Sequence, residues 1–488
     1  MVASGDWLTP RLNGVAHYDK PPLAYWSIAA GIRVLGVNEW GARIGAAVAG
    51  VTLLLATAAI AGGAFLAPLV LASAPLFFAL TRLLATDVFL AAAVAAFYAA
   101  LLAAPARGRG GTLWMFVAMG VGFLAKGPVV LAHTVLPLAA LALWKRHRAL
   151  FAPLGSIWGW LLFLAIAAPW YLSVVAATPG LLPWLAHHEL WMRYTSTIHH
   201  RPGPPWYFVL VVVAGLLPWT FAAFEGIGRA ARNASKSSDS CADAMLLSWA
   251  IVPVLFFSAS GSKLPAYVLP EIPAFAILAA RALERPGVLA RWGTALFALA
   301  LAGLIEFHGP RALAGVVGAQ HAATLPLPAA AHVAAGLFLT AAIAMAVGRP
   351  TAAALAVLGA LYGLLGAAKS IEGPLGSVAP MTRVLERARQ PDESVIELGV
   401  FSAGLPFYTQ KIAPMVDVPR REAFEAPGAS AEPFLARKSL PEMVARDRRV
   451  WVFSTLGRGE READALGLHY TSVARTRTRE LGVFEPMP

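Results

Sequence analysis

The stretch TRLLATDVFLAAAVAAFYAALLAA, residues 81–104, decides the fold class, because a charged segment leads directly into a long apolar run. From Val88 to Ala104 the run holds no charged residue, which is typical of a helix that lies in lipid. Similar runs, bounded by charges or by Pro/Gly clusters, recur through the first 370 residues. They lie at 42–60, 63–81, 88–104, 112–125, 128–144, 156–175, 206–224, 244–258, 265–283, 290–305, 329–347 and 352–369. The pattern predicts about twelve spans, with soft boundaries where a run is shorter than the ~20 residues of a straight span.

The composition of the whole chain supports a membrane protein. Apolar residues make up 58% of the 488 residues and charged residues only 14%, with a mean hydropathy of +0.64, whereas soluble domains average about a quarter charged residues. The net charge of +12 does not indicate nucleic-acid binding, because Lys and Arg fall in short clusters between apolar runs. With Cys241 as the single cysteine, an intrachain disulfide and Cys-based zinc or iron–sulfur sites are excluded.

Basic residues predict the orientation, because they fall in alternate loops and such loops usually face the cytoplasm. The basic clusters are Arg107 with Arg109, Lys145 with Arg146 and Arg148, Arg229 with Arg232 and Lys236, and Arg281 with Arg285. The intervening loops, which carry Asp87 and Lys126, then face the periplasm. Twelve spans put the N-terminal segment on the outer side with nothing to carry it across, so we expect a further transmembrane helix ahead of Met1, or one miscounted span.

The character of the chain changes near residue 371, beyond which it is charged and has no long apolar run. Short strands are predicted at 394–401 and 449–454, and short helices at 382–389 and 440–446. We expect a small α/β domain on the periplasmic face. The predicted organisation is an outer-face interfacial segment (1–40), a transmembrane domain (41–370) and the periplasmic α/β domain (371–488).

The first of five polar segments is HYDKPPLAYW, residues 17–26. Its two prolines fix an extended entry into the helical stretch that follows. Lys20, beside Asp19, could neutralise a lipid phosphate and the charge that develops on it as a leaving group. The alternative is a lysine that extends from the interface toward water.

The second and third segments place charges at the outer ends of spans. Asp87 could act as a general base toward an acceptor hydroxyl; alternatively, Thr86 or Asp87 caps the following helix. Lys126 lies in FLAKGP, residues 123–128, between two apolar runs. A phosphate partner explains this lysine better than a turn, which Gly-Pro alone would make.

The fourth segment, residues 187–206, is the longest polar stretch between spans. Its Trp and Tyr content predicts an amphipathic helix in the interface, on which Glu189 and Arg193 share a face and can pair. Its histidines favour hydrogen bonding to phosphate or sugar, since no HExxH spacing is present. A divalent metal held with Asp19 or Glu189 stays open, and no cofactor is otherwise indicated. These histidines are His187, His188, His199 and His200.

The fifth segment is SASGSKLPAY, residues 258–267, whose small residues let the backbone approach a ligand closely. Lys263 adds an outward-facing cation; the alternative is an exposed loop with one charge. Together the five segments place several cations on one membrane face with Asp87, which suits an anionic lipid headgroup and an acid–base reaction beside it. The cations are Lys20, Lys126, Arg193, Arg201 and Lys263.

As an ordered set these segments resemble the bacterial branch of the protein O-mannosyltransferase superfamily, especially the lipid A 4-amino-4-deoxyarabinose transferases and their undecaprenyl-phosphate-sugar relatives. The resemblance is strong over about residues 1–285 and looser beyond. The matching segments are SGDWLTPRLNG (4–14), DKPPL (19–23), RLLATD (82–87), AKGP (125–128), HELWMR (188–193) with HHRPGP (199–204), and SKLPAY (262–267).

The resemblance implies a GT-C fold with interfacial helices, a periplasmic α/β domain and one more transmembrane helix than the twelve counted. It implies a donor sugar on undecaprenyl phosphate, attacked with inversion. Asp87 matches one of two acidic residues of the family, and Lys20 matches the lysine near the donor phosphate. The predicted set that binds donor phosphate or sugar is Asp19, Lys20, Lys126, Glu189, Arg193, His199, His200, Arg201, Lys263 and Tyr267.

One departure concerns the N-terminus. Family members carry their first helix and an acidic motif ahead of a methionine that Met1 matches. We therefore expect an upstream start; otherwise the product lacks a catalytic carboxylate and is inactive.

The leading hypothesis is a bacterial inner-membrane glycosyltransferase that moves a sugar from polyprenyl phosphate to a lipid or glycan, with lipid A as one candidate, or to a protein, on the periplasmic side. The alternatives are a flippase of a lipid-linked sugar and an inactive truncated homologue. Against a transporter, the charges cluster on one face and no internal repeat is evident.

Overall fold

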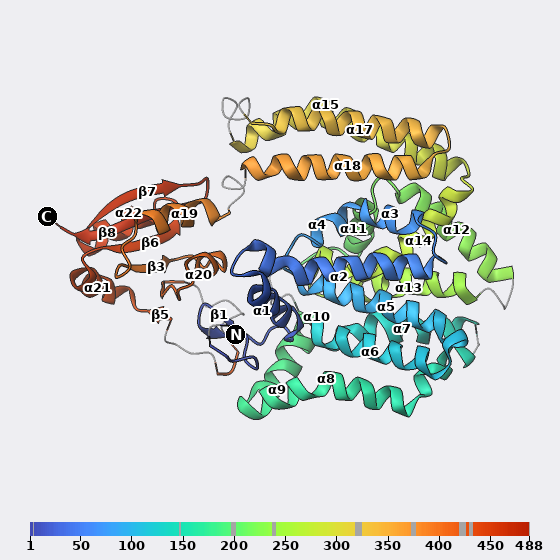
Figure 1. Cartoon of the computed structure of the whole chain (residues 1–488), viewed down its shortest axis with the longest axis horizontal. Helices are drawn as coiled ribbons and strands as arrows, with labels where there is room; N and C mark the ends of the chain where they lie inside the picture. The colour runs from blue at the N-terminus through green and yellow to red at the C-terminus, as the bar shows by residue number, and fades with distance from the viewer. Residues whose placement is uncertain are drawn as a thin grey trace. The chain divides into compact units, whose positions relative to one another are not determined.

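The structure, a computed structural model, describes residues 1–488 except for 3, 146–147, 197–201, 237–240, 318–324, 372–376, 419–425, 429–432 and 488. The chain forms two compact units (Figure 1). The helical unit comprises Met1–Leu8, Asp19–Gly309 and Ala330–Leu364. The sheet unit comprises Thr9–Tyr18, Pro310–Ala329 and Leu365–Pro488. The boundaries at residues 40 and 370, which separate the predicted interfacial, transmembrane and periplasmic segments, are still a prediction.

The helical unit is built from helices that follow the predicted apolar runs. The first part contains α1 (Leu23–Leu35), α2 (Glu39–Ile60), α3 (Leu66–Ala72), α4 (Pro75–Leu80), α5 (Thr86–Arg107), α6 (Arg109–Lys126), α7 (Val129–Lys145), η1 (Arg148–Gly155) and α8 (Ile157–Ala177). Next come α9 (Leu181–Trp184), η2 (Leu185–Met192), α10 (Arg193–Thr195), α11 (Tyr207–Gly215), α12 (Thr220–Lys236) and α13 (Cys241–Ser258). The last part contains η3 (Pro265–Glu271), α14 (Ile272–Glu284), η4 (Leu289–Gly293), α15 (Thr294–Val317), α17 (Leu327–Ala346) and α18 (Pro350–Ala368).

Every predicted apolar run is helical in the structure. Within the described residues, eight helices are long and apolar enough to cross a membrane, and the pair α11 and α12, bent by 111°, makes a ninth candidate. The run at 63–81 forms two short helices, α3 and α4. The helix α1 has 13 residues, too few to cross a hydrocarbon core of ~30 Å, as expected of an interfacial segment.

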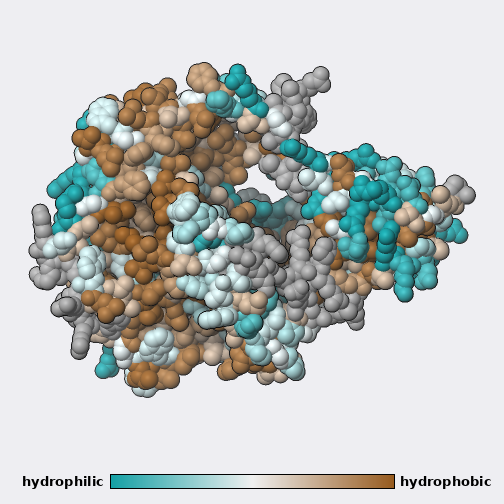
Figure 2. Space-filling model, turned by 180° about the vertical axis from the view of Figure 1, so that it is seen from behind, coloured by the Kyte–Doolittle hydropathy of each residue, from teal (hydrophilic) through white to brown (hydrophobic). Residues whose placement is uncertain are grey.

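The surface of the helical unit is apolar, as lipid contact requires. Figure 2 shows hydrophobic residues over much of this unit and hydrophilic residues over the sheet unit, on the face that it draws. Large side chains point outward, including Trp40 and Leu143, each 81% exposed, and Leu172, 69% exposed. Apolar area of this extent would be unfavourable in water. The predicted polytopic membrane fold is thus confirmed.

The helices α5 and α6 form an antiparallel pair that positions the candidate site. They are joined at Gly108, whose positive φ of 55° suits a glycine between two helices. A Cβ added to Gly111 would lie 2.6 Å from Ala104 Cα, so only glycine allows the helices to approach this closely. Because the helices run in opposite directions, the start of α5 and the end of α6 lie at the same end of the bundle.

The sheet unit confirms the predicted small α/β domain. Its six-stranded sheet has the order β5-β4-β3-β6-β8-β7; the first four strands pair in parallel and the last two pairings are antiparallel. The strands are β3 (Ser394–Leu398), β4 (Met415–Val416), β5 (Phe434–Leu435), β6 (Val450–Thr455), β7 (Leu468–Arg475) and β8 (Arg479–Pro486), and the helices are α19 (Ala379–Ala388), α20 (Gly404–Thr409), α21 (Leu440–Asp447) and α22 (Arg458–Leu466). The predicted strands correspond to β3 and β6, and the predicted helices to α19 and α21.

The N-terminal residues also contribute to the sheet unit. A short hairpin, β1 (Arg11–Leu12) and β2 (Val15–Ala16), packs Val15 against Met415 and Val418. The side chain of Asn13 donates to the Ala413 carbonyl at 2.7 Å and accepts from the Ala413 amide at 2.9 Å. This pairing fixes the hairpin against the loop before β4.

Candidate active site

The centre of the candidate site is an ion pair between Lys126 and Asp87. Asp87 lies in the first turn of α5 and Lys126 in the last turn of α6. Each charge is therefore stabilised by the opposite partial charge at its own helix end. The two side chains are 13% and 10% exposed. The alternative of a helix cap is wrong, because the N-cap of α5 is Ala85, without a side-chain hydrogen bond.

An aromatic side chain adjoins this ion pair. The ammonium of Lys126 lies 4.8 Å from the ring centroid of Tyr267, close enough for a cation–π contact. The ring of Tyr267 stacks on Phe208 with centroids 6.1 Å apart. The buried hydroxyl of Tyr267 has no hydrogen-bond partner in the described part of the chain. A buried hydroxyl is normally hydrogen-bonded, so this one is available to a ligand oxygen.

A second cluster surrounds Lys20, just before α1. Its ammonium lies 3.4 Å from Glu189 Oε2 and donates to the Asp19 carbonyl at 2.7 Å. Glu189, whose side chain is 9% exposed, also approaches His188 Nδ1 at 3.6 Å. The imidazole of His188 stacks on Trp184 with centroids 4.9 Å apart. The structure thus brings the first and fourth polar segments together.

Tyr25 lies close to the carboxylates of this cluster. Burial, together with the negative charges of Asp19 and Glu189, raises the pKa of Tyr25. Its hydroxyl therefore stays neutral and can donate a hydrogen bond. Lys20 accordingly lies among acceptors rather than projecting alone into water, which argues against the interpretation of a lysine that merely extends from the interface.

The two clusters adjoin each other at the end of α6. Gly127 directly follows Lys126 and has a φ of 77°. A Cβ there would lie 3.2 Å from Tyr171 Oη and 4.0 Å from Pro21 Cγ. Since Pro21 follows Lys20 in the chain, these distances put the Lys20 cluster near the end of α6, where Lys126 pairs with Asp87.

Lys263 is placed differently from the exposed loop cation that was the alternative. The residue is 5% exposed, and its ammonium donates to the carbonyls of Ser258 at 2.9 Å and Ser260 at 2.8 Å. It also lies 5.5 Å from the Phe208 ring centroid. Lys263 therefore caps the C-terminal end of α13, and a part in donor binding stays a prediction.

The fourth segment differs from its prediction in local structure. The predicted helix is present, but residues Leu185–Met192 form it as a π-helix, and Glu189 contacts Lys20. Arg193 begins α10, but its side chain, like His199, His200 and Arg201, lies outside the described residues. Among the residues that are described, no group of three His, Cys, Asp or Glu side chains could hold a metal.

Sequence reasoning missed two features near this site. Tyr171 belongs to an apolar span, and its only signal was a hydroxyl beside Trp170 in that span. A buried pair joins His133 Nδ1 and Glu271 Oε1 at 2.6 Å, with exposures of 1% and 0%. Both residues fall inside predicted spans, where ionisable residues usually mark function or a paired partner, so this signal was present in the sequence.

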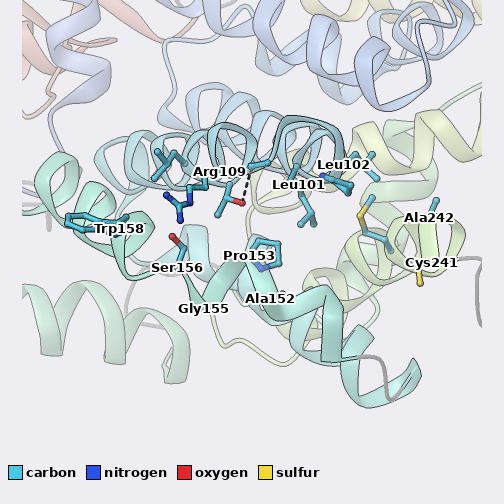
Figure 3. Close-up of a pocket in the computed structure, with 16 residues that line it drawn as sticks. Leu101, Leu102, Arg109, Ala152, Pro153, Gly155, Ser156, Trp158, Cys241 and Ala242 are labelled. Atoms are coloured by element: carbon cyan, nitrogen blue, oxygen red, sulfur yellow. Dashed lines mark hydrogen bonds between the residues drawn. The ribbon is translucent and has the colours of Figure 1, made fainter.

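A cavity of about 910 Å³ lies away from these clusters. Figure 3 shows its lining, which includes Leu101 near the end of α5 and Arg109 at the start of α6. Asp87 is at the opposite end of α5, a helix of 22 residues, which is ~30 Å long. The cavity is therefore separate from the candidate active site.

Comparisons with known proteins agree with the sequence resemblance. Residues 19–172 match the family described as dolichyl-phosphate-mannose-protein mannosyltransferase. The undecaprenyl phosphate-alpha-4-amino-4-deoxy-L-arabinose arabinosyl transferase of Edwardsiella ictaluri is 30% identical over 303 residues, 58% of this chain and 53% of the relative. That of Pseudomonas paraeruginosa is 28% identical over 334 residues, 64% of this chain and 60% of the relative. The chain thus spans little more than half the length of these curated relatives.

Solved structures show the fold over nearly the whole chain. ArnT from Cupriavidus metallidurans, in a crystal structure bound to undecaprenyl phosphate, is 26% identical with a TM-score of 0.85, covering 99% of this chain and 91% of that one. The crystal structure of the same protein in the apo state is 25% identical with a TM-score of 0.83, and it also covers 99% of this chain and 91% of that one. The predicted GT-C fold is confirmed, and the chain is a multi-pass membrane protein that resembles these arabinosyl transferases.

Proposed function

We propose that this chain is a glycosyltransferase that takes a sugar from a polyprenyl-phosphate donor. The observation that carries the proposal is the Asp87–Lys126 pair beside the Lys20 cluster. Two ammonium groups and a carboxylate at one end of a lipid-embedded bundle suit a phosphate on a lipid and a reaction next to it. The names and folds of the similar proteins support the same reaction class.

The lysines would bind the donor phosphate. Lys20 and Lys126 each face a carboxylate, Glu189 and Asp87 respectively. When a phosphate enters, each ammonium can exchange its carboxylate partner for phosphate oxygens. The same cations stabilise the negative charge that builds up on the phosphate as it leaves.

Asp87 would act on the acceptor. The acceptor hydroxyl oxygen forms a bond to the anomeric carbon while the bond from that carbon to the phosphate oxygen breaks. The electron pair stays on the phosphate, and the hydroxyl proton passes to the Asp87 carboxylate, which acts as general base. Release of Lys126 to the phosphate would free this carboxylate at the same moment. If the acceptor group is a phosphate, no proton is removed and Asp87 would serve to orient the sugar.

Tyr267 is placed to help in recognition. Its buried hydroxyl lacks a partner among the described residues, and its ring contacts Lys126. A hydroxyl at this position can hydrogen-bond to a sugar or phosphate oxygen of the donor. We also include the other predicted donor contacts, which are Asp19, Arg193, His199, His200, Arg201 and Lys263.

The sugar and acceptor follow the names of the relatives. We propose 4-amino-4-deoxy-L-arabinose on undecaprenyl phosphate as donor and lipid A as acceptor, within the wider class of lipid and glycan acceptors. Basic residues fall in every second loop, and such loops usually face the cytoplasm. This supports an active site and a sheet unit on the periplasmic side of the bacterial inner membrane. No step of this proposed reaction requires a metal ion.

Reconstitution tests the proposal. The purified chain in proteoliposomes, given labelled undecaprenyl-phosphate sugar and lipid A, should transfer the label, and Asp87→Asn should not. Asp243→Asn is the matched control. Asp243 lies in the first turn of α13, away from the site, and pairs with Arg281. Movement of the donor across the bilayer without transfer would instead support a flippase, and the absence of both activities would reject the proposal.

A further inference from the structure

The cavity at the other end of the helical unit has the features of a second binding site. It is lined by the last turns of α5, by η1, and by the first residues of α6, α8 and α13. Figure 3 shows the lining residues in a row, with Trp158, Arg109 and Ser156 toward one end and Cys241 and Ala242 toward the other. Its volume of about 910 Å³ is that of a ligand pocket rather than a packing defect.

One end of the cavity is polar and positive. The exposed guanidinium of Arg109 has no hydrogen-bond or ion-pair partner among the residues that the structure describes, and the side chain extends toward Ser156 (Figure 3). No lining residue is acidic. At this end the first turns of α6 and α8 add the partial positive charge of two helix N-termini, and the full charge of Arg109 outweighs the partial negative charge at the C-terminal end of α5. The field at this end therefore favours an anion.

The remaining walls are hydrocarbon. Leu101, Leu102, Leu113 and Met245 line the cavity, which lies at the ends of apolar helices. A free anion would gain nothing from such walls, whereas a molecule with a charged head and an alkyl chain would bury the chain against them. The cavity thus matches an amphiphile with its charge at Arg109.

We propose that this cavity binds an anionic phospholipid, with its phosphate at Arg109 and an acyl chain along Leu101 and Met245. The surrounding loops are rich in basic residues, a bias that places this end at the cytoplasmic leaflet, where anionic lipids supply such headgroups. The site lies at the opposite end of α5 and α6 from Asp87, so it goes beyond the proposed transfer reaction and does not depend on it.

Cys241 provides a direct test, because it lines the cavity and is the only cysteine of the chain. The rate of Cys241 alkylation by a maleimide is measured in vesicles of phosphatidylcholine and in vesicles of phosphatidylcholine mixed with phosphatidylglycerol. We expect the alkylation rate to fall about fivefold when the anionic lipid is present. This is the factor by which one basic residue strengthens binding to an anionic lipid surface. Arg109→Gln should abolish the difference.

Arg232→Gln is the matched control. Arg232 is an exposed arginine of α12 that does not line the cavity, so its loss should leave the lipid effect intact. Native mass spectrometry provides a second readout: the wild-type chain and Arg232→Gln should retain phosphatidylglycerol, and Arg109→Gln should not. Equal alkylation in both vesicle types, or an undiminished lipid effect in Arg109→Gln, would overturn the proposal.

Discussion

A double-mutant cycle can separate what the Asp87–Lys126 ion pair contributes to stability from what it contributes to the transfer rate. Both side chains are nearly buried, with exposures of 13% and 10%. Lys126→Met would leave the carboxylate unpaired at that depth, which costs about 3 kcal/mol, the lower end of the range for a broken buried pair. Asp87→Asn with Lys126→Met removes both charges and leaves no unpaired buried charge, so the double variant should recover about 2 kcal/mol of that loss.

Activity should not recover with stability. Asp87→Asn would lack the proposed general base, so the rate constant of transfer should fall by about 10² to 10⁴, and the double variant should stay equally inactive. Stability is measured by unfolding in mixed micelles and activity by initial rates in proteoliposomes. Asp243→Asn, which loses a more exposed pair with Arg281, should leave the rate unchanged.

Two outcomes would refute this reasoning. A double variant that regains both stability and transfer would show that the pair only holds α5 against α6. An Asp87→Asn variant within about tenfold of wild type would show that no base acts there, since a base contributes at least about 10².

Three further predictions concern other parts of the chain. Lys20→Met should lower kcat/KM for the donor at least about tenfold, the value of a lost charged hydrogen bond. In the same initial-rate assay, Lys20→Arg should keep part of the wild-type kcat/KM, because the positive charge remains. Gly127→Val should destabilise the chain by about 1–3 kcal/mol, seen as a lower unfolding midpoint, because φ is 77° and the added carbon would meet Tyr171. Burial raises the pKa of Glu397 from 4.5 to about 8. The folded state then holds a proton that the unfolded state loses, so stability should fall by a few kcal/mol as pH rises between those values, and Glu397→Gln should remove this dependence in thermal unfolding across pH.

The sequence predicted the membrane fold because lipid contact leaves a strong compositional signal. An apolar run such as 88–104 identifies its own helix without reference to any partner. The same is true of β3 and β6, whose hydrophobic cores lie on both faces of the sheet. The bend of 111° between α11 and α12 was not predicted, although Pro218 lies in the break between Gly215 and Thr220 and a proline inside a helical run signals a kink or an end.

The candidate site was predictable as a set of charges but not as a set of contacts. The topology placed Lys20, Asp87 and Lys126 at one membrane face, because each stands at the outer end of an apolar run. It could not indicate that Lys126 pairs with Asp87, 39 residues away, or that Lys20 reaches Glu189, 169 residues away. The π-helix of Leu185–Met192 was likewise hidden, since its residues are equally compatible with an α-helix.

These contacts change the electrostatic description of the site. Counted along the sequence, the lysines make an electropositive surface that would attract any anion. In the structure each of the two central lysines already faces a carboxylate, so a donor phosphate must exchange partners with Glu189 and Asp87 rather than neutralise bare charge. Part of the attraction would therefore be offset before the proposed donor binds, which would also limit retention of a lipid phosphate product. In the proposed mechanism the carboxylate released from Lys126 is also the group that accepts the proton, so donor binding would free the base.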